Sequence, residues 1–382
     1  EDVFLAGVRI SLLAQADDLI VSLSVRGLRV KLSTLERWCA MNFILVNLIK
    51  TIILIFGPTL SPLPMFHLGS TQLTVKTDEK YVGINLRTDT RNILEDHYKA
   101  KARTARYCGH RIMAIEDMTG RLTPKELKQL YMARVDCHLI HGCEVSPDSE
   151  DVHVKQLCKV QVSFIRQMLN LHSRSMIAPL FTETGVMPLR VRRLLLNLSH
   201  LQYFLSLNDD TYARAALNSS IKLSGKGKLG DLIKVASRLP FHCPDLDLTR
   251  STFIRDVGNY ADLVQKLCME WLQDEINSSE KLYLLHGRRE PQKDKAPTQV
   301  TSYMRHHLSM PAQYQTAQTP RTRLSTHTVS LTLAVEVLRY VDHAYAPVPR
   351  SDRLCRFCKT DIEMPEHTLL TCQSSDPLVE LR

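Results

Sequence analysis

The sequence predicts an α+β protein that is predominantly helical, and three observations lead to this prediction. Apolar runs of β-type residues, separated by turn residues, are concentrated in residues 1–91. From residue 92 to residue 283, apolar residues recur at helical spacing, with interruptions at Gly and Pro. The composition, 44% hydrophobic and 23% charged over 382 residues, is that of a globular chain long enough for two or three domains.

The first predicted elements are a β-hairpin and a helix. Two apolar runs, residues 8–15 and 19–25, flank an acidic turn at residues 16–18, which is a hairpin pattern. The helix follows directly, because four apolar residues then fall at helical spacing. They are Leu28, Leu32, Leu35 and Cys39.

Short antiparallel strands are predicted next, at residues 43–46, 51–56, 72–75 and 81–85. The most apolar stretch of the chain, residues 40–60, contains two of them. Asn42, Asn47 and Lys50 interrupt this stretch, and its uninterrupted run, residues 51–56, is too short to span a bilayer, so we expect no membrane partner.

The rest of the chain is predicted to be helical, then extended, then a small Cys/His segment. Helical periods run through residues 92–283. Residues 284–325 lose the apolar period and carry Arg, Lys, Pro, Gln and Thr, which is typical of a basic linker. Residues 326–382 contain a predicted helix at 328–341, followed by the Cys/His segment.

Charge and cysteine usage restrict the partners and the compartment. There are 49 Lys and Arg against 40 Asp and Glu, and the net charge of +9 favours a polyanionic partner, either nucleic acid or an anionic surface. The ten Cys are mostly isolated, and residues 1–30 have no signal-peptide pattern. This predicts an intracellular protein with reduced thiols and one metal site.

The acidic turn has one chemical use beyond turning the chain. Asp17 and Asp18 are adjacent carboxylates between two apolar runs. Mg²⁺ prefers such oxygen ligands together with substrate phosphates, and two bound ions can promote in-line nucleotidyl transfer. The alternative is a plain turn, because Asp is a common turn residue.

Three basic clusters in the helical half are candidate phosphate contacts. Each could instead be a solvated helix face or loop. Contacts of this kind are independent of sequence and strongly dependent on salt. The candidate residues are Lys99, Lys101, Arg103, Arg106, Arg192, Arg193, Lys226 and Lys228.

The Cys/His segment has the spacing Cys-x2-Cys-x8-His-x4-Cys. Its members are Cys355, Cys358, His367 and Cys372. Three thiolates and one imidazole complete a tetrahedral zinc site, and zinc would supply folding energy to so small a segment. The alternatives are unpaired thiols or a redox Cys-x2-Cys pair.

Four short motifs stand close together in the first part of the chain: Ala-Asp-Asp at 16–18, Trp-Cys-Ala-Met-Asn at 38–42, Asn47 with Lys50-Thr51, and Lys-Tyr-Val-Gly-Ile at 80–84. With these motifs, residues 10–145 resemble the reverse transcriptase of non-LTR (LINE-type) retrotransposons, fungal ones in particular. The resemblance thins between about residues 146 and 350 and returns at the C-terminus, because LINE-type proteins often end in a similar Cys-Cys-His-Cys element.

This resemblance implies a domain order and an activity. Residues 1–91 would be part of the polymerase palm, 92–283 a helical thumb and connection, 284–325 the linker, and 326–382 a helix with a zinc knuckle. The whole enzyme would be an RNA-directed DNA polymerase that uses Mg²⁺ and deoxynucleoside triphosphates, with an RNA template, a DNA primer or target, and access to the nucleus. Asp17 and Asp18 match the metal-binding pair, and Lys50 matches the lysine beside the phosphates of the incoming nucleotide.

Two departures from the family pattern restrict that expectation. Gln15 stands where the family has an aromatic residue. The family's further palm Asp, like its fingers, would lie before Glu1, so we expect a fragment that is inactive by itself. The second hypothesis is therefore a non-catalytic nucleic-acid-binding remnant or a domesticated zinc-knuckle protein. A third is a zinc-dependent protein-interaction module, in which the net charge of +9 is incidental. Independently of these hypotheses, Lys50 could be a surface lysine at the start of a strand.

Overall fold

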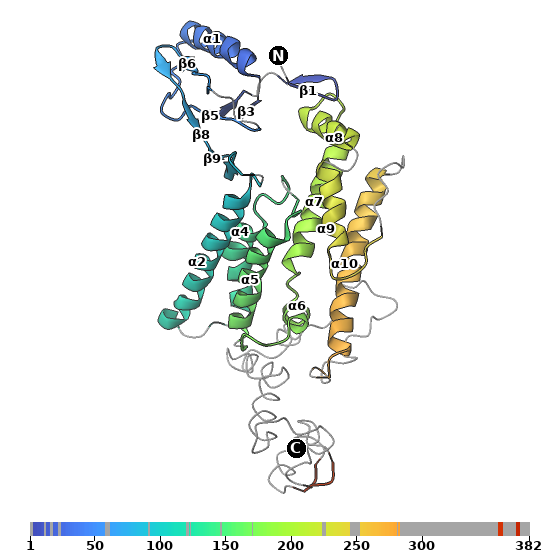
Figure 1. Ribbon diagram of the computed structural model, residues 1–382. Coiled ribbons are helices and arrows are strands. Elements are labelled where there is room, and N and C mark those ends of the chain that lie inside the picture. The colour runs from blue at the N-terminus through green and yellow to red at the C-terminus, as the bar shows by residue number, and fades with distance from the viewer. Residues whose placement is uncertain are drawn as a thin grey trace. The chain divides into compact units, whose positions relative to one another are not determined.

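The computed structural model describes residues 3–10, 13–15, 18–21, 24–57, 62–90, 92–119, 122, 124–145, 147–169, 171–223, 227–244, 253–280, 282, 358–361 and 372–374. This part is α+β and mostly helical, with its strands near the N-terminus (Figure 1). Contacts divide it into two compact units. Unit 1 comprises Glu1–Gly109, Ala133–Gln161 and Met187–Cys268, and unit 2 comprises His110–Met132, Val162–Val186 and Met269–Arg382.

Two short hairpins begin the chain. β1 (Val3–Leu5) pairs with β2 (Val8–Ile10), and β3 (Leu13–Gln15) pairs with β4 (Asp18–Ile20), both antiparallel. The second is the predicted hairpin, which is confirmed with shorter strands. The first was missed, because residues 8–15 were interpreted as one apolar run, whereas β2 and β3 occupy its two ends.

The predicted helix over Leu28 to Cys39 is confirmed as α1 (Val25–Met41). The Ser24 hydroxyl accepts a hydrogen bond from the Gly27 N–H at 3.3 Å, which caps the first turn. Leu32 is buried against a small apolar cluster, and the hydrophobic effect holds the helix to this cluster. The other buried members of the cluster are Phe66, Leu68 and Leu73.

The predicted strand at residues 43–46 is wrong. Phe43 has φ of +54°, a left-handed conformation that no strand accommodates, and its side chain is 96% exposed. The backbone N–H of Asn42 and of Ile44 still bond to carbonyls at the end of α1. The apolar run therefore belongs to a helix terminus and the loop after it.

The remaining strands form small sheets. β5 (Ile52–Leu54) pairs in parallel with β8 (Thr74–Lys76), which corrects the predicted antiparallel arrangement for this pair. β6 (His67–Leu68) and β7 (Thr71–Gln72) form an antiparallel pair. The strand predicted at 81–85 is two strands, β9 (Asp78–Tyr81) and β10 (Ile84–Arg87), because Val82 and Gly83 turn the chain with positive φ.

The helical half is confirmed. Pro179 lies in the first turn of its helix and Pro188 caps the next, so both prolines mark helix starts as well as breaks. The described helices are α2 (Glu95–Thr119), α3 (Pro124–Leu130), the π-helix η1 (Tyr131–Asp136), α4 (Cys137–Ile140), α5 (Asp151–Met168), α6 (Ala178–Thr184), α7 (Leu189–Ser206), α8 (Tyr212–Lys222), α9 (Lys228–Ser237) and α10 (Phe253–Asn277). None of them is long and apolar enough to cross a membrane.

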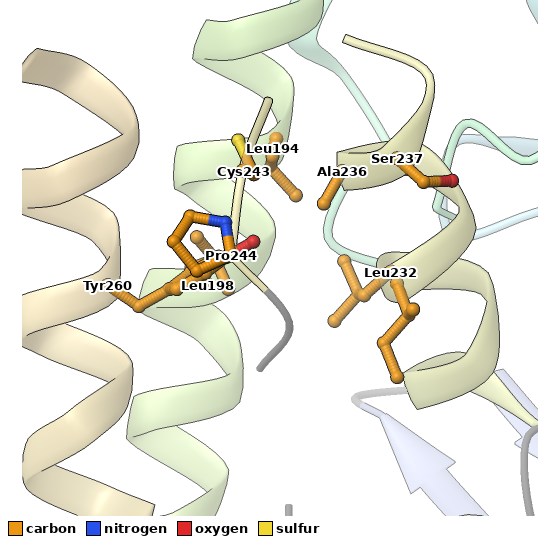
Figure 2. A pocket seen from close by; sticks show the side chains of 9 residues that line it. Leu194, Leu198, Leu232, Ala236, Ser237, Cys243, Pro244 and Tyr260 are labelled. Carbon is orange, nitrogen blue, oxygen red and sulfur yellow. The ribbon is translucent and has the colours of Figure 1, made fainter. Parts of the chain in front are cut away.

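The core of unit 1 surrounds α7 and contains a small pocket. Leu194 and Leu198 of α7 face Leu232 of α9, and Cys243 and Tyr260 are among the other residues that line it (Figure 2). The free volume is about 30 Å³, room for one or two water molecules and far too little for a nucleotide. The pocket is therefore a packing defect in an apolar core.

The predicted linker and the predicted helix at 328–341 lie outside the described residues. The predicted domain boundaries likewise stay predictions.

Candidate nucleic-acid interface

The outward face of α2 carries an uninterrupted set of cationic residues. Between Asp96 and Glu116 the chain has no acidic residue, while it has five Lys and Arg. Lys99, Arg103 and Arg106 follow one another at spacings of four and three residues, so they lie on one face, and all three are exposed. Exposed Tyr107 lies beside them and could stack on a base.

This arrangement is unfavourable for the helix itself. Cations in the first turns oppose the helix dipole, and like charges four residues apart, such as Lys99 and Arg103, repel one another. Lys99 is compensated by Glu95, at 2.6 Å between Nζ and Oε1. Arg103 and Arg106 form no ion pair or hydrogen bond with any described residue. Uncompensated charge that the fold does not need is typical of a binding surface.

Lys101 is separated from this face. It lies on a flank of α2, is partly buried, and approaches Lys80 of β9. Burial and then the charge on Lys80 lower the pKa of Lys101. The predicted cluster of four residues is therefore two surfaces: Lys99, Arg103 and Arg106 together, and Lys101 apart.

Arg193 is not a surface residue, which corrects its predicted role as a phosphate contact. Its side chain is 2% exposed and forms a bidentate ion pair with Asp148, with Nε–Oδ2 and Nη2–Oδ1 both at 2.7 Å. It also donates to the Leu139 carbonyl, and the Tyr98 hydroxyl donates to Asp148 at 2.7 Å. The guanidinium therefore joins α2, α4, α7 and the loop before α5 inside unit 1.

Arg192 and Lys228 are also held by neighbouring groups. Arg192 Nη2 is 2.8 Å from the buried carboxylate of Asp136. Lys228 Nζ donates to the Glu144 carbonyl at 2.5 Å and lies 5.1 Å from the centre of the Phe204 ring. Burial lowers the pKa of Lys228. Both residues stabilise the packing of unit 1 in this structure.

The predicted polymerase residues are only partly described. Asp17 and Lys226 lie outside the described residues, and for Asp18 only the backbone is described, in β4 opposite Gln15. Lys50 is exposed in a turn before β5, where its N–H bonds to Asn47 at 3.2 Å. The structure therefore leaves the roles of Asp17, Asp18 and Lys50 as predictions.

The predicted zinc site is also only partly described. Cys358 is partly buried and Cys372 is buried, whereas Cys355 and His367 lie outside the described residues. No group of three or more potential metal ligands occurs among the residues that the structure describes. Thiolate and imidazole donors suit zinc, so the four-ligand assignment stays a prediction.

Comparisons with known proteins give no relative. No family model matches the chain, and neither a curated protein nor a solved structure matches it.

Sequence reasoning missed the group around Lys101. In the sequence Lys80 stands out only within the family-like stretch at 80–84, and His138 and His141 belong to no motif. All three act electrostatically on Lys101 or on one another. The signal present in the sequence was the lack of acidic residues around Lys101, but its partners are 21 to 40 residues away.

Proposed function

We propose that this chain is the C-terminal part of a LINE-type reverse transcriptase and that its helical half binds the phosphate backbone of a template–primer. The whole enzyme would be an RNA-directed DNA polymerase that takes Mg²⁺ at Asp17 and Asp18 and zinc at its C-terminal Cys/His segment. The binding part of this proposal is supported by the basic face of α2, where Arg103 and Arg106 have no partner among the described residues.

The chemistry of that face favours a strand backbone over a compact ligand. Lys99 and Arg106 are seven residues apart, so the cations extend over roughly 10 Å of helix. An extended row of cations suits successive phosphates, and contacts of this kind do not depend on base sequence. Tyr107 adds a ring for base stacking at the same face.

Salt dependence of binding tests this proposal. The full chain would be titrated against a labelled RNA–DNA primer–template at several salt concentrations, and log K plotted against log salt. The double variant Arg103→Gln/Arg106→Gln is expected to reduce the slope by about 2, because each lost phosphate contact removes about 0.9. A matched control, Lys125→Gln/Lys159→Gln, removes the same charge from exposed positions elsewhere and should leave the slope unchanged. Equal slopes for both double variants would contradict the assignment.

A non-catalytic nucleic-acid-binding remnant is the second candidate, and Gln15 favours it. Gln15 pairs with Asp18 across the hairpin, at the position where the resemblance implies an aromatic residue. Primer extension with the reading frame continued upstream distinguishes the candidates. Extension that is lost in Asp17→Asn supports the polymerase, whereas binding without extension supports the remnant.

A further inference from the structure

Four positively charged or titratable groups from three elements of unit 1 lie together beside the β9–β10 turn. Lys80 belongs to β9, Lys101 to α2, and His138 and His141 to α4 and the residue after it. Each acts electrostatically on at least one of the others. None of the four belongs to the outward face of α2, which Lys99, Arg103 and Arg106 form.

The cluster is held in place by packing that includes a third histidine. His97 accepts a hydrogen bond from the Asn85 N–H at Nδ1, at 3.4 Å, and its Nε2 is 3.3 Å from the His141 carbonyl. These partners require a neutral ring that is protonated at Nε2. Gly83 in the β9–β10 turn lies directly over the His141 ring, where an added Cβ would be 3.3 Å from two ring atoms.

Among the described residues the two ammonium groups of the cluster have no ion-pair partner, although Glu144 acts electrostatically on His141. The Lys101 ammonium is partly buried and forms no hydrogen bond or ion pair with a described residue. The Nδ1 atom of His141 is buried and also has no hydrogen-bond partner in the part of the chain that the structure describes. Burying a polar or charged group without a partner costs free energy, so a ligand that supplies the partner is stabilised at this place.

We propose that Lys80, Lys101, His138 and His141 form a phosphate-binding site that is separate from the outward face of α2. Two ammonium groups and two imidazoles in one place suit a compact group with more than one negative charge. The source is either a terminal phosphate or an internal phosphodiester of a nucleic-acid strand. The assignment of this phosphate to a nucleic-acid strand rests on the proposed function. The anion site itself does not, because a free anion can also bind there.

Binding at this site depends on pH. Burial and then the charge on Lys101 lower the pKa of His138 and of His141, so both rings are mainly neutral at pH 7. A bound anion favours the charged rings and raises both pKa values. The charged or titratable groups that act on this cluster are Lys80, His97, Lys101, Cys137, His138, His141 and Glu144.

The experiment is a histidine NMR titration of the full chain with inorganic phosphate, with sulfate as a probe whose charge is constant between about pH 5.5 and 8. The His138 and His141 signals are identified with the variants His138→Gln and His141→Gln. We expect both signals to shift, both pKa values to rise, and sulfate affinity to increase as the pH falls. Lys101→Gln should weaken binding by about tenfold, because it removes a charge-assisted hydrogen bond. Lys159→Gln is the matched control and should have no effect.

The outcomes separate this proposal from the preceding one. No shift at either histidine, or equal affinity in Lys101→Gln and the parent, overturns the phosphate site, whatever the α2 variants do. Histidine shifts that persist while Arg103→Gln/Arg106→Gln leaves nucleic-acid binding unchanged would retain the site and refute the α2 interface. Comparing 5′-phosphorylated with 5′-hydroxyl oligonucleotides identifies the source. Tighter binding of the phosphorylated strand assigns a terminal phosphate, and equal binding assigns a phosphodiester.

Discussion

Replacing Arg193 with Met removes the charge at the centre of unit 1 while keeping most of the side-chain volume. The variant leaves the Asp148 carboxylate, which is 4% exposed, without its bidentate partner, and leaves the Leu139 carbonyl without a donor. Removing one member of a buried ion pair costs about 3–5 kcal/mol, because the remaining charge stays desolvated. We expect a loss of that size in the free energy of unfolding, measured by urea titration with circular dichroism.

The same helix offers a matched control. Arg190, one turn earlier on α7, pairs with Asp151 at 2.7 Å, but both side chains are partly exposed. Arg190→Met should therefore cost at most about 1 kcal/mol. The double variant Arg193→Met/Asp148→Leu should be more stable than Arg193→Met alone, because it removes the unpaired carboxylate.

Two results would refute this reasoning. Equal losses for Arg193→Met and Arg190→Met would mean that burial does not determine the cost. A reduced salt slope for nucleic-acid binding in Arg193→Met, measured where the variant is folded, would restore Arg193 as a phosphate contact.

Three further predictions concern other parts of the molecule. Burial lowers the pKa of His97 to about 4, so the folded state favours the neutral ring. The free energy of unfolding that this contributes above about pH 6.5 should be lost as the pH falls toward 4. In urea titrations at several pH values, His97→Gln should flatten this dependence. Metal analysis of the full chain should find one zinc ion per chain. The zinc content should fall in Cys372→Ser and stay unchanged in Cys137→Ser, a control at an exposed thiol. A full equivalent of zinc in Cys372→Ser would contradict the four-ligand assignment. Gly83→Ala should lower the melting temperature more than Gly57→Ala does. Both glycines have positive φ, but of the two only Gly83 has a histidine ring within 4 Å of an added Cβ. Equal effects on the melting temperature would mean that the ring moves aside.

The elements that the sequence predicted well are those whose pattern is local. The apolar spacing from Leu28 to Cys39 predicted α1, and the predicted interruptions at Pro179 and Pro188 fall at helix starts. Residues 43–46 failed for the opposite reason. They have strand composition, but hydrogen bonds to the end of α1 and the positive φ of Phe43 decide their conformation, and neither can be read from a run of apolar side chains.

For the residues of the candidate site, too, only those joined by a local pattern could be predicted from the sequence. The basic face of α2 could be predicted because Lys99, Arg103 and Arg106 are neighbours on one helix. The burial of Arg193 could not, because its partner Asp148 is 45 residues away and no local pattern joins them. Buried positions, Val191 and Leu194, also stand close to Arg193 on both sides in the sequence.

The predicted cations therefore fall into two groups, according to whether a neighbouring group in the fold stabilises their charge. Arg193 has a buried counter-ion and a carbonyl, and Lys228 has a carbonyl and an aromatic ring, so the charge of each already stabilises unit 1. Arg103, Arg106 and Lys101 have no such partner among the described residues, and each costs the fold repulsion or desolvation. An anion removes that cost, so binding and local stability must rise together at these positions. A ligand that leaves the melting temperature unchanged cannot be binding there.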